Sequence, residues 1–433
     1  MSKKVTILCP YCFKSFQREE VQIQCKNYET VLKMNEDGTS VVRDICPPEE
    51  DAAYNNYWKT RSPIKHIFDA NLTKAERGGL FRKPQLIQAK KCPQCGILSQ
   101  NFVCPHCHNR LPTEMIEKGS EIISVVGGPA SGKSNYIVTL IHDLRKYGNK
   151  LGLNVTLQQV GRTDKERTTN MYKAAEKIIF EDHFALEKTS ETPHAIPWII
   201  RLESKQTEKA VYLVFYDTAG EAFKSQEKIA RDVLYFEHSK AVIVALDTLA
   251  VPQIKKILQK NNVEVSDQIY DYKEMLDTIK AIDQSDTGHD LTLRPYAFVF
   301  TKFDTVIDNA KDLGFGGDQL VNRFVDDDGR FVNSSYMKDG KVKLNDMKEC
   351  NDAIVAALND EEIWDQSAVV SDVDNWNKDG RSNGMFFGVS ALGGMEDGTT
   401  IKTDEKGEVR PIRVLDPLVW ILIKLGGFGI KTE

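Results

Sequence analysis

The sequence has no long apolar run and no excess of positive charge. Its 433 residues include 57 Lys and Arg against 63 Asp and Glu, which gives a formal net charge of −6. The apolar stretch at 418–425 is interrupted by Lys424 and is shorter than the roughly 18–20 residues of a membrane-spanning helix. The run Val5–Leu8 is too short for the core of a signal peptide. We therefore expect a cytoplasmic protein without a membrane span, and the charge gives no strong indication that it binds nucleic acid.

Cysteine is concentrated at one end of the chain, where eight of the nine cysteines precede residue 108. Without an export signal, such cysteines serve metals or catalysis more often than disulfides. Six of them form three Cys-x-x-Cys pairs, and two pairs separated by a hairpin-length loop can place four thiolates tetrahedrally around one Zn²⁺. A redox dithiol would leave the second pair unexplained. The spacing predicts a zinc site formed by Cys92, Cys95, Cys104 and Cys107.

The remaining early cysteines predict a second Zn²⁺ site with looser spacing, formed by Cys9, Cys12, Cys25 and Cys46. In a rival arrangement the Cys9–Cys12 pair exchanges partners with the other group, and the sequence does not decide between the two. In either case zinc would stabilise a small module, because so short a segment cannot build an adequate core alone.

A phosphate-binding pattern follows a buried strand expected at 122–126. The residues Gly127–Ser134 read GGPASGKS and match G-x-x-x-x-G-K-[ST], and helical apolar spacing follows over 135–147. Glycines allow backbone N–H groups to surround phosphates, and the helix N-terminus adds a positive dipole. We expect Lys133 to reach the β- and γ-phosphates and the Ser134 hydroxyl to coordinate Mg²⁺. The other candidate nucleotide-binding residues here are Gly127, Gly128, Ser131, Gly132 and Asn135.

Three later motifs each follow an apolar strand. After 210–216, Asp217 can hold Mg²⁺ through water and the Gly220 N–H can meet the γ-phosphate. After 296–300 comes Thr301-Lys302-Phe303-Asp304, where the Asp304 carboxylate can accept two hydrogen bonds that guanine offers and adenine does not. The stem of Lys302 would pack over the sugar or base. After 386–389 come Ser390, Ala391 and Leu392, and the Ala391 N–H can contact guanine O6.

In this order the four motifs resemble those of the P-loop GTPase superfamily, of the Ras-like and translation-factor class, over roughly residues 121–425. The resemblance implies a three-layer α/β domain, with a mostly parallel sheet and one antiparallel strand, that binds GTP or GDP and Mg²⁺. We expect a cysteine-rich zinc-ribbon module over 1–118 and a GTPase domain over 119–433. The latter carries an insertion at about 305–385, whose Asp-rich segments, 371–374 among them, we interpret as solvated loops.

The sequence departs from the family pattern at the two switch segments. A switch threonine precedes an antiparallel strand in small GTPases, and Thr192, before the strand expected at 196–203, is the candidate here, with Thr189 second. Thr192 would also ligate Mg²⁺. Glu221 occupies the position of the glutamine that orients the attacking water, so we expect slow intrinsic hydrolysis. Lys133, Thr192 and Glu221 are the candidate catalytic residues.

The zinc module followed by an enlarged GTPase domain resembles the bacterial double-sized GTPases with zinc ribbons that are linked to conflict and defence systems. That resemblance implies a cytosolic molecular switch that works with an effector or activator protein. The sequence leaves two alternatives to this function open. One is a scaffold that binds guanine nucleotide without hydrolysing it, and the other is a nucleic-acid adaptor that acts through the ribbons.

Overall fold

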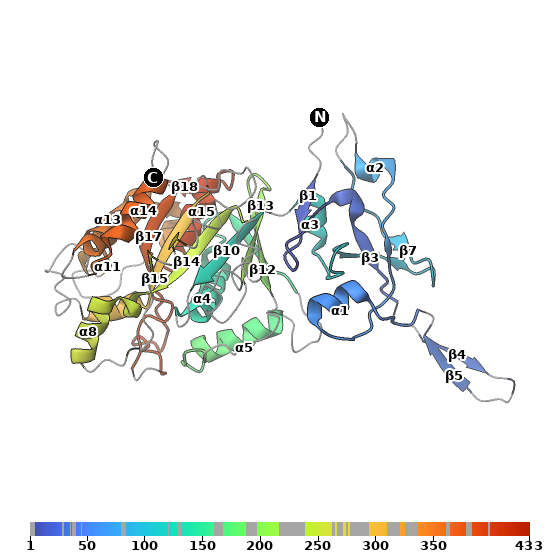
Figure 1. Cartoon of the computed structure of the whole chain (residues 1–433), viewed down its shortest axis with the longest axis horizontal. Coiled ribbons are helices and arrows are strands. Elements are labelled where there is room, and N and C mark those ends of the chain that lie inside the picture. Colours follow the sequence, from blue (N-terminus) through green and yellow to red (C-terminus); the bar gives the residue numbers. More distant parts are fainter. Residues whose placement is uncertain are drawn as a thin grey trace. The chain divides into compact units, whose positions relative to one another are not determined.

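The chain forms two compact units, Met1–Glu121 and Ile122–Glu433 (Figure 1). The structure is a computed structural model, and it describes residues 5–27, 30–34, 36, 40–44, 46–78, 84–119, 121–127, 131–159, 168–187, 197–215, 239–261, 265, 272–273, 276–277, 294–309, 321–324, 334, 336–360, 364–377, 383–396 and 399–433.

The first unit consists of short strands joined by tight turns. Its central sheet has the order β6 (Ile67–Asp69), β3 (Gln22–Gln24), β9 (Asn101–Val103), and Phe68, Ile23 and Phe102 lie side by side in it and are buried. Its other described elements are hairpins and short helices: β1 (Thr6–Leu8) with β2 (Ser15–Gln17), β4 (Thr30–Met34) with β5 (Ser40–Asp44), β7 (Lys90–Lys91) with β8 (Leu98–Ser99), η1 (Arg18–Glu20), α1 (Ala52–Trp58), α2 (Lys74–Arg77) and α3 (Thr113–Lys118).

The second unit is built on a seven-stranded sheet with the order β11-β12-β13-β10-β14-β15-β17. Strands β10, β13, β14, β15 and β17 are parallel, and only β12 runs against its neighbours, β11 and β13. A mostly parallel sheet with one antiparallel strand is therefore confirmed. The strands are β10 (Ile122–Gly127), β11 (Leu153–Leu157), β12 (Trp198–Ser204), β13 (Ala210–Phe215), β14 (Ala241–Asp247), β15 (Tyr296–Thr301) and β17 (Gly384–Gly388).

Helices cover both faces of this sheet, which explains why its central strands are continuous apolar runs. On one face, α4 (Lys133–Tyr147) and α15 (Asp416–Leu425) share a core with β10 and β15. On the other face, Phe300 contacts Tyr272 and Trp364, and Val373 of α14 (Ser367–Trp376) packs close to Gly384 of β17, on the side of Phe298. The further elements are α5 (Thr168–Phe180), η3 (Thr248–Ala250), α8 (Pro252–Lys260), α10 (Phe303–Asp308), α11 (Val321–Phe324), α12 (Tyr336–Asp339), β16 (Lys341–Val342), α13 (Leu344–Asn359) and β18 (Lys431–Thr432).

Two sequence interpretations can be compared with these elements. The apolar run at 418–425 lies in α15, which is buried along most of its length. Residues 371–374, interpreted as a solvated loop, instead belong to α14, where Val373 is buried and packs close to Gly384 of β17. The interpretation as a loop was wrong because the acidic residues fit a helix with one buried face: Asp374 is exposed, and Asp372 pairs with Lys273.

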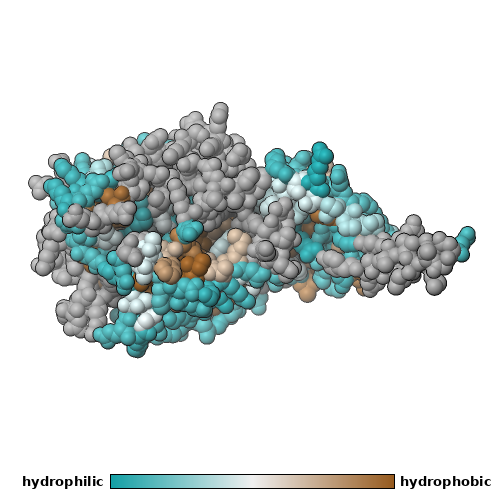
Figure 2. Space-filling view, turned by 90° about the horizontal axis from the view of Figure 1, so that it is seen from below, coloured by the Kyte–Doolittle hydropathy of each residue, from teal (hydrophilic) through white to brown (hydrophobic). Residues whose placement is uncertain are grey.

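The described surface is largely hydrophilic in the view of Figure 2, with one cluster of apolar residues on the second unit. The large apolar side chains that the structure describes as exposed are Leu86 and Leu98 in the first unit and Ile178 and Phe184 in the second. Among the described helices, none has the length and apolar character that a bilayer crossing requires.

Candidate functional site

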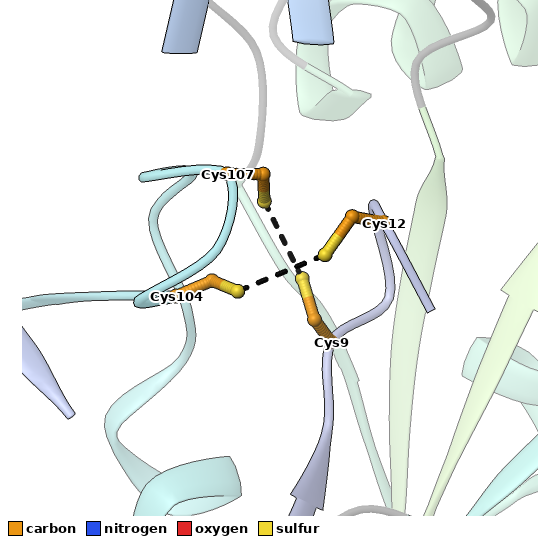
Figure 3. A group of neighbouring side chains, drawn as sticks. All are labelled: Cys9, Cys12, Cys104 and Cys107. Carbon is orange, nitrogen blue, oxygen red and sulfur yellow. Dashed lines mark hydrogen bonds between the residues drawn. The ribbon is translucent and has the colours of Figure 1, made fainter. Parts of the chain in front are cut away.

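The eight early cysteines form two groups of four, but not the two groups that their spacing predicts. Cys9 and Cys12 lie with Cys104 and Cys107, whose side chains point toward one another in Figure 3, while Cys25 and Cys46 lie with Cys92 and Cys95. The predicted pairing was therefore wrong, and the rival exchange of the Cys9–Cys12 pair is what the structure contains. We call the two groups cluster 1 (Cys9, Cys12, Cys104, Cys107) and cluster 2 (Cys25, Cys46, Cys92, Cys95).

The central sheet of the first unit explains this exchange. Strand β9 leads into Cys104 and β3 leads into Cys25, and because the two strands are antiparallel their following cysteines lie at opposite ends of the sheet. The pair Cys92–Cys95 and the pair Cys104–Cys107 therefore separate although they are close in sequence. Cys25 and Cys46 flank the β4–β5 hairpin, so cluster 2 joins the two ends of that hairpin, which extends from the unit in Figure 1.

All three Cys-x-x-Cys pairs are held by the same backbone turn. The N–H of the fourth residue after the first cysteine donates to that cysteine's carbonyl, at Phe13, Gly96 and His108. These residues have φ values of 54°, 75° and 52°, in the left-handed region. The first cysteine's N–H in turn donates to the carbonyl five residues later, that of Lys14, Ile97 and Asn109. The turn aims both sulfurs of a pair in one direction.

The sulfur geometry fits zinc in both clusters. Four thiolates at the usual Zn–S distance of about 2.3 Å form a tetrahedron whose edges are about 3.8 Å. The Sγ atoms of Cys9 and Cys107 are 3.7 Å apart and those of Cys12 and Cys104 are 3.8 Å apart. In cluster 2 the corresponding distances are 3.6 Å for Cys25–Cys95 and 3.9 Å for Cys46–Cys92. Each cluster could therefore hold one zinc ion.

Hydrogen bonds and burial in the clusters also suit a metal site. The N–H groups of Tyr11 and His106 donate to the sulfurs of Cys9 and Cys104 in cluster 1, which favours the thiolate form that a metal binds. Burial raises the pKa of the Cys9 thiol, so this thiol would keep its proton until a metal ion binds the sulfur and displaces the proton.

The predicted phosphate loop continues from β10 into α4. Gly132 has a φ of 67° and precedes the first residue of α4, and among the described residues no side chain caps that helix. A Cβ added to Gly127, the last residue of β10, would lie 2.8 Å from the Ala245 carbonyl, so this end of β10 lies too close to β14 for a larger residue. Lys133 and the Ser131 side chain are buried, and the Ser131 Oγ has no hydrogen-bond partner among the described residues. A helix N-terminus beside a glycine turn fits a bound phosphate.

The Thr301–Asp304 segment follows β15 and contacts the phosphate loop. The Thr301 hydroxyl lies 2.7 Å from the Ser131 carbonyl, to which it can donate. Lys302 has a φ of 56°, and its Cε would be 3.8 Å from a Cβ on Gly132, so the lysine stem crosses toward the loop. Its ammonium lies 3.0 Å from the Asp247 carboxylate, at the end of β14.

Asp304 and the segment after β17 come together at the same edge of the sheet. Asp304 is 7% exposed. Burial raises the pKa of its carboxyl, and a hydrogen bond with Ser390 opposes this. Ser390 is buried and accepts the Gly393 N–H, while the Ala391 carbonyl accepts the Thr139 hydroxyl of α4. A buried carboxylate with few donors of its own can bind a ligand that supplies N–H groups.

The remaining predicted site residues lie near this site, in the core or outside the described residues. The Asn135 Oδ1 accepts the Leu186 N–H at 3.0 Å, which ties the segment after α5 to the start of α4. Leu392 is partly buried against the core. Gly128, Thr189, Thr192, Asp217, Gly220 and Glu221 lie outside the described residues.

Sequence reasoning missed Asp247. This residue ends an apolar strand, as Asp304 and Asp217 follow theirs, and it is the charged partner of Lys302. The apolar run 241–246 followed by an aspartate was the signal that could have identified it.

The chain is similar to a known protein over part of its length. No family model matches the chain. Over 158 residues the chain is 28% identical to a putative ESX-1 scaffolding and assembly protein, SaeC, of Mycolicibacterium smegmatis. That match spans 35% of the chain and 40% of the length of SaeC.

Proposed function

We propose that the second unit is a guanine-nucleotide-binding and GTP-hydrolysing switch of the P-loop GTPase superfamily, and that the first unit is a zinc-stabilised module that binds a partner protein. A cytoplasmic location fits this proposal, since the eight clustered thiols need a reducing compartment to remain available for zinc. A bacterial defence system is the narrower setting that the sequence resemblance suggests.

One observation carries the proposal. The Gly127–Lys133 loop, Thr301–Asp304 and Ser390–Ala391 follow three different strands, and the described residues of these segments meet at one edge of the sheet. Ligands of parallel α/β sheets bind outside the carboxyl ends of the strands. A phosphate loop and a buried carboxylate at that edge suit the two ends of a guanine nucleotide.

In this proposal each group has a separate role. The N-terminal end of α4 and Lys133 would hold the phosphates, and the Ser134 hydroxyl would ligate Mg²⁺, which would neutralise charge developing on the transferred phosphoryl group. Asp304 would accept the N1–H and 2-amino hydrogen bonds of guanine, and Ser390 orients that carboxylate. By the family resemblance, Asp217 and Thr192 would complete the Mg²⁺ site and Glu221 would lie near the attacking water.

The base assignment can be tested by changing the hydrogen-bonding pattern of residue 304. Xanthine keeps the N1–H of guanine but carries a carbonyl in place of the 2-amino group. An asparagine offers one acceptor and one donor, so Asp304→Asn should weaken GDP binding at least a hundredfold and strengthen binding of xanthosine diphosphate. Lys133→Ala is the matched control, because it should weaken both nucleotides alike. Equal loss of both in Asp304→Asn would contradict the assignment.

A second function, a scaffold that binds guanine nucleotide without turnover, is favoured by the similarity to a protein named for scaffolding and assembly. The two proposals share the nucleotide site and differ in the fate of GTP. Single-turnover phosphate release from the zinc-loaded full chain separates them. Release that is lost in Lys133→Ala supports the switch, and bound GTP that stays intact for hours supports the scaffold.

A further inference from the structure

Asp247 is a buried carboxylate outside the four nucleotide-binding motifs. It is the last residue of β14, in register with Thr301 of β15, and its exposed fraction is 6%. Strand β14 also pairs with β10, which leads into the phosphate loop. Asp247 therefore ends the strand that lies between the phosphate loop and the Thr301–Asp304 segment.

Each oxygen of this carboxylate has a partner. The Oδ2 atom lies 3.0 Å from the Lys302 Nζ, and the Oδ1 atom accepts the Leu249 N–H at 3.2 Å. The Tyr272 hydroxyl donates to the Asp247 carbonyl. The bonds to Leu249 and Tyr272 hold Asp247 in place. Lys302 has the longer and more flexible side chain, so the ion pair fixes the position of Lys302.

Lys302 needs such a partner to take one position. Its stem has four rotatable methylene groups, and its side chain is 33% exposed, so an unpaired Lys302 would sample many rotamers. Paired with Asp247, the stem passes over Gly132 at the phosphate loop. A ligand that packs against a stem already held in place loses less side-chain entropy on binding.

We propose that Asp247 is a positioning residue that holds Lys302 across the nucleotide site and so slows the release of purine nucleotide. This inference rests on the proposed function, because Lys302 can act only on a nucleotide bound there. Asp247 itself contacts Lys302 and the backbone.

The test is a double-mutant cycle on nucleotide release. A fluorescent GDP analogue is loaded on the zinc-replete full chain, and its dissociation is followed after addition of excess GDP. Asp247→Ala and Lys302→Ala should each speed release about tenfold, and the double variant should match Lys302→Ala alone. Asp247→Asn should lie between wild type and Asp247→Ala, since its amide oxygen still accepts from the ammonium.

A merely structural role gives different results. Loss of support for β14 would lower the melting temperature, and its effect on release would multiply with that of Lys302→Ala. Asp182→Ala, which removes an exposed ion pair with Lys177, is the control and should leave release unchanged. If Asp247→Ala does not fold, the cycle of Asp247→Asn with Lys302→Ala decides in the same way.

The possible failures are distinguishable. A wild-type chain that binds no guanine nucleotide contradicts the proposed function. A wild-type chain that binds GDP, with release unchanged in the Asp247 variants or with multiplicative effects, overturns the positioning role alone.

Discussion

The assignment of cysteines to the two clusters can be tested by removing sulfurs in pairs. Cys9→Ser with Cys104→Ser removes two ligands from cluster 1 and leaves cluster 2 whole. Cys92→Ser with Cys104→Ser removes one ligand from each cluster. The pairing predicted from sequence spacing reverses these roles, because it places Cys92 and Cys104 in one site. The two double variants therefore separate the alternatives.

The expected loss of zinc in each variant follows from the geometry of the clusters. Each cluster has four sulfurs that all lie within 4.8 Å of one another, as a tetrahedral Zn²⁺ site requires. A site of this kind binds zinc with about 10–16 kcal/mol at neutral pH. Removal of a thiolate costs a large part of that free energy, since serine is a poor zinc ligand. We expect two zinc ions per chain in the wild type, one in Cys9→Ser/Cys104→Ser, and none in Cys92→Ser/Cys104→Ser.

The assay measures the metal content of each variant after equilibration in a zinc buffer. The free zinc concentration is set so that a site with four thiolates keeps its zinc and a site with three thiolates loses it. Elemental analysis gives zinc per chain, and thiol titration of the same samples counts the unligated sulfurs. The reasoning is refuted if Cys92→Ser/Cys104→Ser keeps one zinc ion while Cys9→Ser/Cys104→Ser keeps none.

Three further predictions follow from the described contacts. Burial alone would raise the pKa of Glu76, but Lys90 and backbone N–H groups lower this pKa to about 2. The ionised carboxylate should therefore stabilise the fold fully above about pH 4.5, and this stabilisation should be lost as the pH falls toward 2. Glu76→Gln should lower the free energy of unfolding by about 2–3 kcal/mol at pH 7, measured by denaturant titration of the zinc-loaded chain. A Cβ at position 388 would lie 2.8 Å from the Phe303 ring; Gly388→Ala should therefore displace Asp304 and weaken GDP binding more than tenfold in a binding titration, and Phe303→Leu should restore part of it. Because burial raises the pKa of the Cys9 thiol, zinc binding should release protons, so zinc affinity in a chelator competition should increase between pH 6 and pH 8, and a pH-independent affinity would contradict this.

The sequence predicts much of the second unit because its strands are long apolar runs. The runs at 122–126 and 296–300 lie in parallel strands, as do residues 210–215 of the run at 210–216. The described residues of the motifs after β10 and β15 then fall at one edge of the sheet. The antiparallel strand expected at 196–203 is also present, as β12. A buried apolar run constrains its own conformation, so local sequence suffices there.

The zinc pairing could not be predicted in the same way. The separation of Cys92 from Cys104 depends on the antiparallel register of β3 and β9, and each of these strands has three residues. Strands this short carry little periodicity, so the spacing of the cysteines alone favoured the wrong partner. Asp247 was missed for a related reason, because its partner Lys302 is 55 positions away in the chain and no motif joins them.

The central claim is that the second unit binds guanine nucleotide in preference to adenine nucleotide. The most direct measurement is equilibrium binding of Mg·GTP and Mg·ATP to the zinc-replete full chain by calorimetry. The account predicts binding of GTP at least a hundredfold tighter than ATP, because adenine offers no pair of donors to Asp304. Equal affinity for the two nucleotides, or no binding of either, would contradict it.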